Sequence, residues 1–164
     1  MTENSPHDGS RKNADVIVAE RKAAMALLAQ ATAVELTRGL AQLGTLPEHA
    51  DLRAAETGLV MVRGRIGGDG APFNLGEATV TRAAVQLASG EIGYSYALGR
   101  DARKARLAAL CDALWQSAQH RPALEQHILA PMRERLERER AETRACTAAT
   151  KVDFFTLVRG ENAA

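Results

Sequence analysis

The chain has little that would hold it together covalently or through a metal ion. Its 164 residues include only two cysteines, Cys111 and Cys146, which are too far apart for a CxxC pair and lie near no pair of histidines. The common zinc-site spacings are therefore excluded, and we expect both thiols to be reduced, as in the cytoplasm. A chain of this length can bury a single core without such staples. We expect one domain with no bound metal.

Three further shortages narrow the class of protein. Aromatic residues make up 4% of the chain, which leaves little material for the base-stacking surfaces of single-stranded nucleic-acid binders. The 21 basic residues are balanced by 20 acidic ones, so there is no general attraction to DNA or RNA. No apolar run approaches the roughly 20 residues that cross a bilayer, and the polar start lacks the apolar core of a signal peptide. We therefore expect a cytoplasmic protein without nucleic-acid or membrane partners, in which residues 1–14 are disordered.

Helical patterns occupy both ends of the chain. Apolar residues recur at helical spacing over residues 15–30. Thr32 and Glu35 then stand three residues apart, as in a capping box that starts a second, short helix. The clearest helix follows Asp101, a good capping residue, and has a strong apolar face. A last helical run follows Pro122, and from residue 132 to 144 it is mostly charged, so it is either solvated or reaches toward a partner.

The middle third of the chain has the two-residue period of β-strands. Residues 58–66 alternate between two faces, and a turn at Thr57 and Gly58 would pair them with the segment that precedes. Two later segments rich in β-branched residues meet at Ser89 and Gly90, a pair suited to a hairpin turn. The pattern therefore predicts an antiparallel sheet.

Taken together, these elements predict an α+β fold, with an antiparallel sheet of about four strands covered by helices in a single domain of residues 15–164. Its end is unusually apolar, because residues 151–161 include Phe154, Phe155 and Leu157 after a helix that buries little. Adjacent phenylalanines face opposite sides of an extended chain. We expect this arm to be a last strand of the sheet or to dock on another subunit.

Two arginines and four glycines mark the segment RIGGDGAPFNLGEATVTR, from Arg65 to Arg82. It is not a P-loop, because Glu77 stands where the lysine belongs, and it lacks the third glycine of a dinucleotide fingerprint. Arg65 and Arg82 become neighbours if the flanking strands pair, with Asn74, Glu77 and Thr81 nearby. Such a cluster would bind an oxyanion through guanidinium contacts. The alternative is a plain turn whose arginines pair with glutamate or face water.

No constellation of catalytic residues stands out elsewhere. The four histidines are scattered, so the sequence shows neither a metal triad nor a nucleophile with its base. Tyr94 and Tyr96 share one face of a strand, a spacing more typical of core or edge residues than of acid catalysts. The sequence therefore identifies no catalytic residue.

Four stretches, in order along the chain, carry a resemblance to a known family. They are RAAETGLV (53–60), FNLGEATVTRAAV (73–85), GYSYALGRD (93–101) and KVDFFTLVRGE (151–161). On these stretches the chain resembles PhnG, a subunit of the bacterial carbon-phosphorus lyase system for phosphonate breakdown. Four matching stretches are far more specific than a single glycine motif.

The resemblance implies a subunit that works with PhnH, PhnI and PhnJ, together with PhnL and a further candidate, PhnK. It implies support of the reaction of ATP with methylphosphonate, which releases adenine and forms α-D-ribose 1-methylphosphonate 5-triphosphate. ATP is then a substrate of the complex, an iron-sulfur cluster and S-adenosylmethionine belong to PhnJ, and this chain binds no cofactor. The resemblance supplies no catalytic residue, so Arg65, Arg82, Arg100 and Arg159 are candidates for contact with the triphosphate or with a subunit.

Two other functions stay open from the sequence. A free-standing phosphate-ester or nucleotide-binding protein would be built around the loop between Arg65 and Arg82, and the isolated chain would bind its ligand. A purely structural adaptor would tolerate the loss of those charges as long as the complex still assembled.

Overall fold

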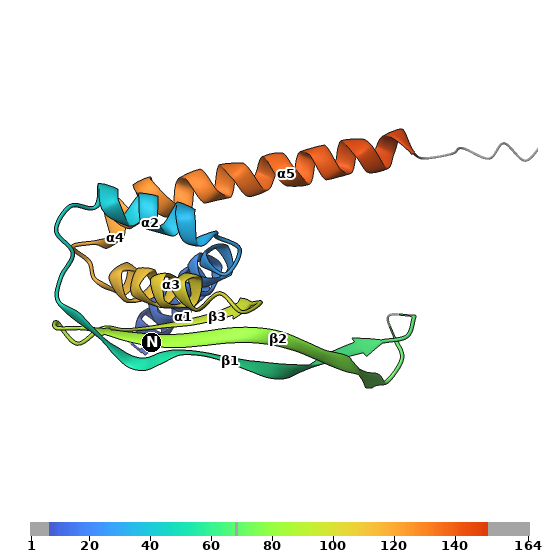
Figure 1. Cartoon of the computed structure of the whole chain (residues 1–164), viewed down its shortest axis with the longest axis horizontal. Helices are drawn as coiled ribbons and strands as arrows, with labels where there is room; N and C mark the ends of the chain where they lie inside the picture. The colour runs from blue at the N-terminus through green and yellow to red at the C-terminus, as the bar shows by residue number, and fades with distance from the viewer. Residues whose placement is uncertain (1–6, 68, 151–164) are drawn as a thin grey trace, which may run out of the picture. The chain divides into compact units, whose positions relative to one another are not determined.

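The computed structural model describes residues 7–67 and 69–150. In chain order the elements are α1 (His7–Leu28), α2 (Ala33–Gln42), β1 (His49–Arg65), β2 (Pro72–Leu87), β3 (Ile92–Leu98), α3 (Ala102–Gln116), α4 (Arg121–Leu124), the π-helical turn η1 (Glu125–Leu129) and α5 (Ala130–Ala149) (Figure 1). The chain divides into two units, Met1–Arg133 and Glu134–Ala164. The sheet lies entirely in the first unit, so any site built on the sheet belongs to that unit.

The sheet is antiparallel and has the order β1-β2-β3. The β1–β2 pairing begins with His49 opposite Leu87 and ends with Arg65 opposite Pro72, so these two strands run side by side along their whole length. β3 pairs with residues 80–86 of β2 only. It is therefore a short strand at the edge of the sheet.

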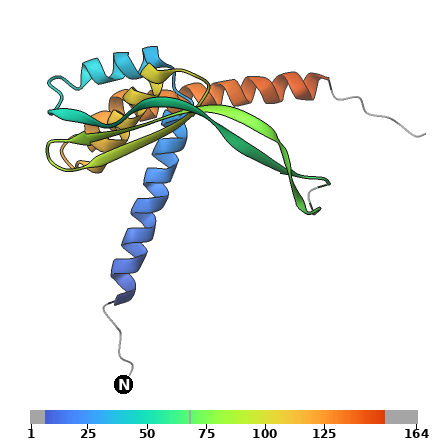
Figure 2. The same ribbon diagram turned by 60° about the horizontal axis from the view of Figure 1, so that its bottom comes forward.

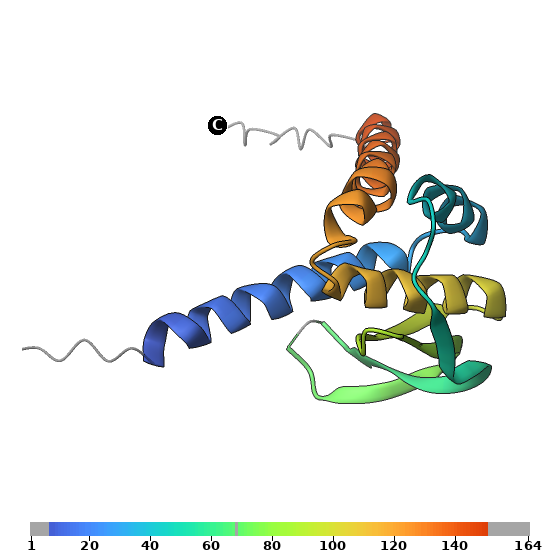
Figure 3. The ribbon, with the colours of Figure 1, turned by 90° about the vertical axis from the view of Figure 1, so that its left-hand side faces the viewer.

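α1, α2 and α3 lie on the same side of the sheet (Figure 3). The buried side chains form one aliphatic cluster, drawn from these helices, from the helix-facing side of β2 and from the last helical run. Its largest fully buried members are Leu28, Leu36, Val85, Leu87, Cys111, Leu114, Leu124 and Leu129. The predicted α+β class is confirmed.

The far half of the β1–β2 pair has no third strand beside it. Residues 59–65 and 72–79 continue past the end of β3 as a two-stranded ribbon, which we call the distal ribbon (Figures 1 and 2). A two-stranded ribbon on its own is at best marginally stable in water. The distal ribbon therefore has little tertiary support from the part of the chain that the structure describes.

Local sequence signals predicted several element ends correctly. The Thr32 side chain accepts a hydrogen bond from the Glu35 N–H (3.2 Å), and the Glu35 carboxylate accepts one from the Thr32 N–H (2.8 Å), as in a capping box. Asp101 accepts the Lys104 N–H (2.8 Å) at the start of α3. The β2–β3 hairpin turns at Gly90, whose φ of 105° is in the region that favours glycine.

Two boundaries differ from the prediction. β1 does not turn at Thr57 and Gly58, because Gly58 is paired with Val80 inside a continuous strand, and the sheet of the described residues has three strands instead of about four. Thr-Gly is a local turn signal, but pairing along all of β2 outweighs it. α1 already begins at His7, so the expected disordered segment, residues 1–14, is helical from that residue onward.

The predicted helical run after Pro122 is present as α4, η1 and α5. The π-helical turn η1 immediately precedes Pro131, whose nitrogen has no hydrogen to donate to the helical ladder. Farther along α5, Arg135 and Glu139 form an i,i+4 ion pair at 2.6 Å. Every residue from 137 to 149 is exposed. This stretch of helix has no cover from the described residues, as both predicted alternatives, a solvated helix and one that reaches a partner, require.

The predicted C-terminal arm, residues 151–161, lies outside the described residues. Within residues 7–67 and 69–150, no helix is long and apolar enough to cross a membrane. Over the same ranges, no three side chains of the metal-binding types gather at one place.

Candidate functional site

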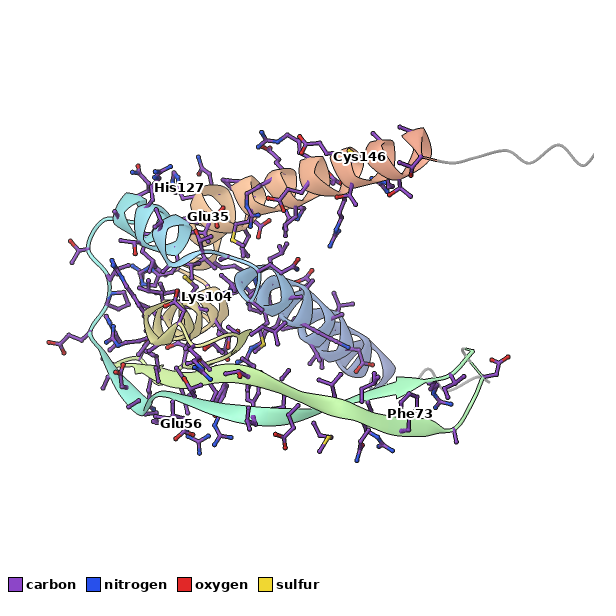
Figure 4. The ribbon with its side chains drawn as sticks, turned by 45° about the vertical axis from the view of Figure 1, so that its right-hand side comes forward. Glu35, Glu56, Phe73, Lys104, His127 and Cys146 are labelled. Carbon is purple, nitrogen blue, oxygen red and sulfur yellow. The ribbon has the colours of Figure 1, made fainter. Side chains whose placement is uncertain are left out.

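A row of three polar side chains crosses the three strands of the sheet. Glu56 of β1 is paired with Arg82 of β2, which is paired with Tyr96 of β3. Arg82 Nε donates to Glu56 Oε1 at 2.6 Å. Hydrogen bonds with Tyr96 and Glu56 raise the pKa of the Arg82 guanidinium. The row lies on the face of the sheet away from the helices, where Glu56 is labelled in Figure 4.

The main role of this row is to join neighbouring strands. The Arg82 guanidinium is paired and is not a free cation. Arg82 and Glu56 are about equally exposed, at 43% and 48% of their side chains, so water screens the pair. Arg53 brings a second guanidinium to 3.7 Å from the same Glu56 oxygen. The cluster of two cations and one carboxylate keeps one positive charge in excess. It can therefore attract an anion weakly, but it contains no paired nucleophile and base.

The prediction that Arg65 and Arg82 are neighbours is wrong. Arg65 is opposite Pro72 at the tip of the distal ribbon, whereas Arg82 is opposite Glu56. Residues 56 and 65 are nine positions apart on one strand, a separation of about 30 Å. Arg65 instead donates to the Gly70 carbonyl oxygen (3.1 Å) and closes the tip turn. The register alone decides which side chains meet.

Thr81 has a structural role. Its side chain is buried, donates to the Gly99 carbonyl oxygen (2.7 Å) and lies 3.1 Å from the Thr57 hydroxyl. These contacts satisfy a polar group that would otherwise cost free energy in the core. Thr81 is therefore not accessible to a ligand.

The remaining predicted site residues do not gather. Asn74 and Glu77 are exposed on the distal ribbon, and Arg100 is exposed in the turn between β3 and α3. The other predicted residues lie outside the described ranges: Phe154, Phe155, Leu157 and Arg159. The predicted oxyanion cluster is thus not assembled by the sheet.

A second polar cluster, which we did not predict, joins α1, α3 and β3. The Asp112 side chain is 1% exposed and accepts hydrogen bonds from Arg21 Nε (3.0 Å), Arg21 Nη2 (2.7 Å) and the Tyr94 N–H (2.9 Å). Arg21 and Gln116 also donate to the Ile92 carbonyl oxygen, at 3.2 and 2.7 Å. The hydrogen bond to Asp112 raises the pKa of Arg21. Every member has a partner, so this cluster fastens the edge strand to the helices.

One sequence signal for this cluster was available. Asp112 interrupts the run from Ala108 to Trp115, whose other members are apolar and buried. A carboxylate on such a face must find a partner, because a buried unpaired charge is very costly. The signal does not identify Arg21, however, because that residue is 91 positions away.

The buried thiol of Cys111 does not form a nucleophilic site. Burial raises the pKa of the Cys111 thiol, which keeps it protonated and inert. Cys146 is exposed on α5. Among the described residues, then, the polar clusters support binding and assembly better than bond-breaking chemistry.

An apolar groove of about 610 Å³ lies between α1 and the free edge of β3. Its walls are Val18, Arg21, Lys22, Met25, Ala26, Leu28 and Ala29 of α1, Tyr94, Ser95, Tyr96 and Ala97 of β3, and Ala108 of α3. We call it the edge groove. Most of the surface that lines it is apolar.

The distal ribbon exposes apolar side chains on both of its faces. Leu59, Met61, Val62, Phe73 and Leu75 are all exposed there, and Phe73 is labelled in Figure 4. Exposed apolar patches of this kind mark sites of association. Both surfaces therefore suit a protein that is covered by others.

Comparison with known proteins agrees with this reading of the surfaces. The profile of the family described as "Phosphonate metabolism protein PhnG" matches residues 19–160. The chain is also 51% identical over 155 residues to "Alpha-D-ribose 1-methylphosphonate 5-triphosphate synthase subunit PhnG" of Rhizobium meliloti (strain 1021), covering 94% of this chain and 99% of that relative. The chain belongs to the PhnG family. The expected family and its link to phosphonate metabolism are thereby confirmed.

The PhnG match covers both polar clusters, the distal ribbon and the edge groove except for Val18. It also extends over residues 151–160, beyond the last described helix. The relative carries the word "subunit" in its name. That word agrees with the structure, because no described residue covers the apolar side chains of the edge groove and the distal ribbon.

Proposed function

We propose that this chain is the PhnG subunit of an α-D-ribose 1-methylphosphonate 5-triphosphate synthase in organic phosphonate catabolism. The observation that carries the proposal is 51% identity with the synthase subunit of Rhizobium meliloti across 99% of that protein. The synthase would use ATP and methylphosphonate and release adenine. The chain contributes to this transfer as part of a complex.

Its role is to assist assembly and to support the active site of the synthase. Another subunit supplies the reacting groups. In support, the side chains of Arg82, Thr81 and Asp112 form hydrogen bonds with other residues of the same chain. The exposed apolar side chains of the distal ribbon give the chain a surface that partners can cover.

The proposed partners are PhnH, PhnI and PhnJ in the core, with PhnL and, as a further candidate, PhnK. ATP is a substrate of the whole complex, and this chain holds no cofactor of its own. The iron-sulfur cluster and S-adenosylmethionine serve PhnJ. The complex works in the cytoplasm.

The alternative of a free-standing nucleotide-binding protein has lost its structural basis. It required Arg65 and Arg82 to meet around one loop, and the strand register holds them apart. A structural adaptor differs from an assisting subunit in one respect only. It would leave adenine release unchanged when exposed arginines are replaced in an intact complex.

The first experiment is co-purification of the tagged chain with PhnH, PhnI and PhnJ, followed by an assay of adenine release from ATP and methylphosphonate. We expect a stable complex and adenine release that stops when this chain is left out. Partners that release adenine equally well without the chain would contradict the proposal. A chain that binds no partner would contradict it as well.

A further inference from the structure

The outer edge of β3 is occupied by helix side chains at the Ile92 carbonyl and the Tyr94 N–H, but it is open farther along, at Tyr96. The Ile92 carbonyl and the Tyr94 N–H point away from β2, because their partners are on α1 and α3. Main-chain groups alternate along an antiparallel strand, so those of Tyr96 and Leu98 point the same way. The described residues supply no partner for the outward groups of Tyr96. This open edge forms one side of the edge groove.

An added strand would find apolar surface on both of its faces. On the helix side of the groove it would meet Val18, Met25 and Ala26 of α1. On the other side it would lie beside Tyr96 and Leu98, which are 53% and 73% exposed. The groove thus fits a strand with large apolar side chains on both faces, which is unusual for an edge strand.

The chain itself contains such a segment. Residues 152–158, VDFFTLV, are as long as β3 and place Phe154 and Phe155 on opposite faces when extended. Within the segment the one charged residue is Asp153. Lys22 lines the groove, and the structure describes no ion-pair partner for it. The segment and the groove are therefore complementary in apolar faces and charge.

The helix before this segment suits delivery to another molecule. Residues 137–149 of α5 are exposed on all sides, and these 13 residues extend about 20 Å beyond Leu136. Residues 150 and 151 add at most about 7 Å of reach. The segment therefore begins beyond about 20 Å of solvated helix, a length suited to reaching a second molecule.

We propose that residues 152–158 of one copy add a strand to β3 in the edge groove of a second copy. The exchange is reciprocal, so both copies contribute one segment and one groove to a twofold-symmetric dimer. It holds whether or not the chain is a synthase subunit, because it depends only on the groove and the segment.

The test uses full-length chains that carry one reporter cysteine each, with Cys146 replaced by serine. One chain carries Ala26→Cys in the groove, and a second, mass-tagged chain carries Leu157→Cys, on the same face of the extended segment as Asp153. After mixing and mild oxidation with oxidised glutathione, we expect a disulfide between the two different chains. Glu20→Cys is the matched control for the groove, because it lies on α1 but does not line the groove, and it should give little crosslink.

A second measurement is sedimentation equilibrium of the full chain. We expect a dimer that becomes monomeric in Phe155→Asp. Lys22→Glu and Asp153→Lys should each weaken the dimer about fivefold, and the two changes together should restore it.

Several outcomes would overturn the proposal. One is a full chain that stays monomeric at all concentrations, and another is a dimer that Phe155→Asp leaves intact. A third is a chain carrying both cysteines that closes its disulfide within one monomer, since the segment would then occupy its own groove. Crosslinking from Glu20→Cys as strong as from Ala26→Cys would also contradict it.

Discussion

At the scale of single residues, the carboxylate of Asp112 is a buried charged group that needs hydrogen-bond partners inside the fold. It sits on the apolar face of α3 and is satisfied by residues of α1 and β3. Breaking such a pair from one side is costly, because the remaining partner keeps its charge and loses its acceptor. The cluster therefore links the stability of α1 to that of the edge strand.

Asp112→Ala should lower the free energy of unfolding by about 3 kcal/mol, because it leaves Arg21 and the Tyr94 N–H without an acceptor. Urea denaturation at a fixed protein concentration measures the change. Asp51→Ala is the matched control, because its pair with Arg106 is 34% and 42% exposed. That variant should lose less than about 1 kcal/mol. Equal losses in the two variants would show that the buried cluster stabilises the fold no more than an exposed ion pair does.

Gly93 is the second residue on which the fold depends. A Cβ built there would overlap the Ala109 carbonyl oxygen and the Ala113 nitrogen, and it would lie 2.9 Å from the Ala113 Cα. The absence of a side chain thus lets β3 approach the backbone of α3 directly. Backbone atoms of a helix cannot move aside as a flexible side chain can.

Gly93→Ala should therefore destabilise the chain by about 3 kcal/mol or leave it insoluble. Thermal unfolding followed by circular dichroism measures the shift in midpoint. Gly58→Ala is the control, because a Cβ at that position of β1 has no atom within 4 Å. It should be close to neutral. A Gly93→Ala chain as stable as the control would refute the close packing of β3 on α3.

At the scale of elements, the distal ribbon has no evident role in the fold of the isolated chain. It adds no buried side chain to the core cluster, yet it exposes large apolar residues on a two-stranded scaffold. Such a ribbon gains stability when a partner covers it. We therefore expect it to contribute to the complex and little to the stability of the chain.

Replacing Phe73 and Leu75 together by aspartate should leave the unfolding midpoint unchanged but weaken co-purification with the partner subunits at least about tenfold. The reason is that both side chains are exposed in the chain alone. Val34→Asp is the control, since Val34 is 67% exposed on α2, away from the ribbon. Undiminished partner binding by the double variant would exclude the distal ribbon from the interface.

At the scale of the whole molecule, the core cluster of the described residues ends, along the chain, well before the apolar C-terminal segment begins. All members of the core cluster lie between Ala24 and Met132, and residues 137–149 are exposed. The C-terminal segment should therefore matter for association and not for folding.

Removing residues 151–164 should leave the thermal midpoint and the helical circular dichroism unchanged, while the chain no longer assembles with its partners. The physical reason is that the truncation takes away Phe154, Phe155 and Leu157 but none of the core side chains. Circular dichroism and co-purification measure the two effects. A truncated chain that still co-purifies in full would contradict the prediction.

The sequence by itself determined the features that depend on residues close together in the chain. The capping box of Thr32 and Glu35 spans three residues, and the hairpin at Gly90 depends on a local backbone angle. The α+β class follows from the same local periods. The family resemblance was also present in the sequence, because it depends on residue order.

Only the tertiary structure decided which distant residues meet. The register of β1 and β2 places Arg82 opposite Glu56 and Arg65 at the far tip of the ribbon. The sequence pattern had suggested that the two arginines are neighbours. The partner of Asp112 lies 91 residues away on another helix. Strand register and helix packing are set by the burial of whole faces. No short stretch of sequence therefore contains the information that fixes them.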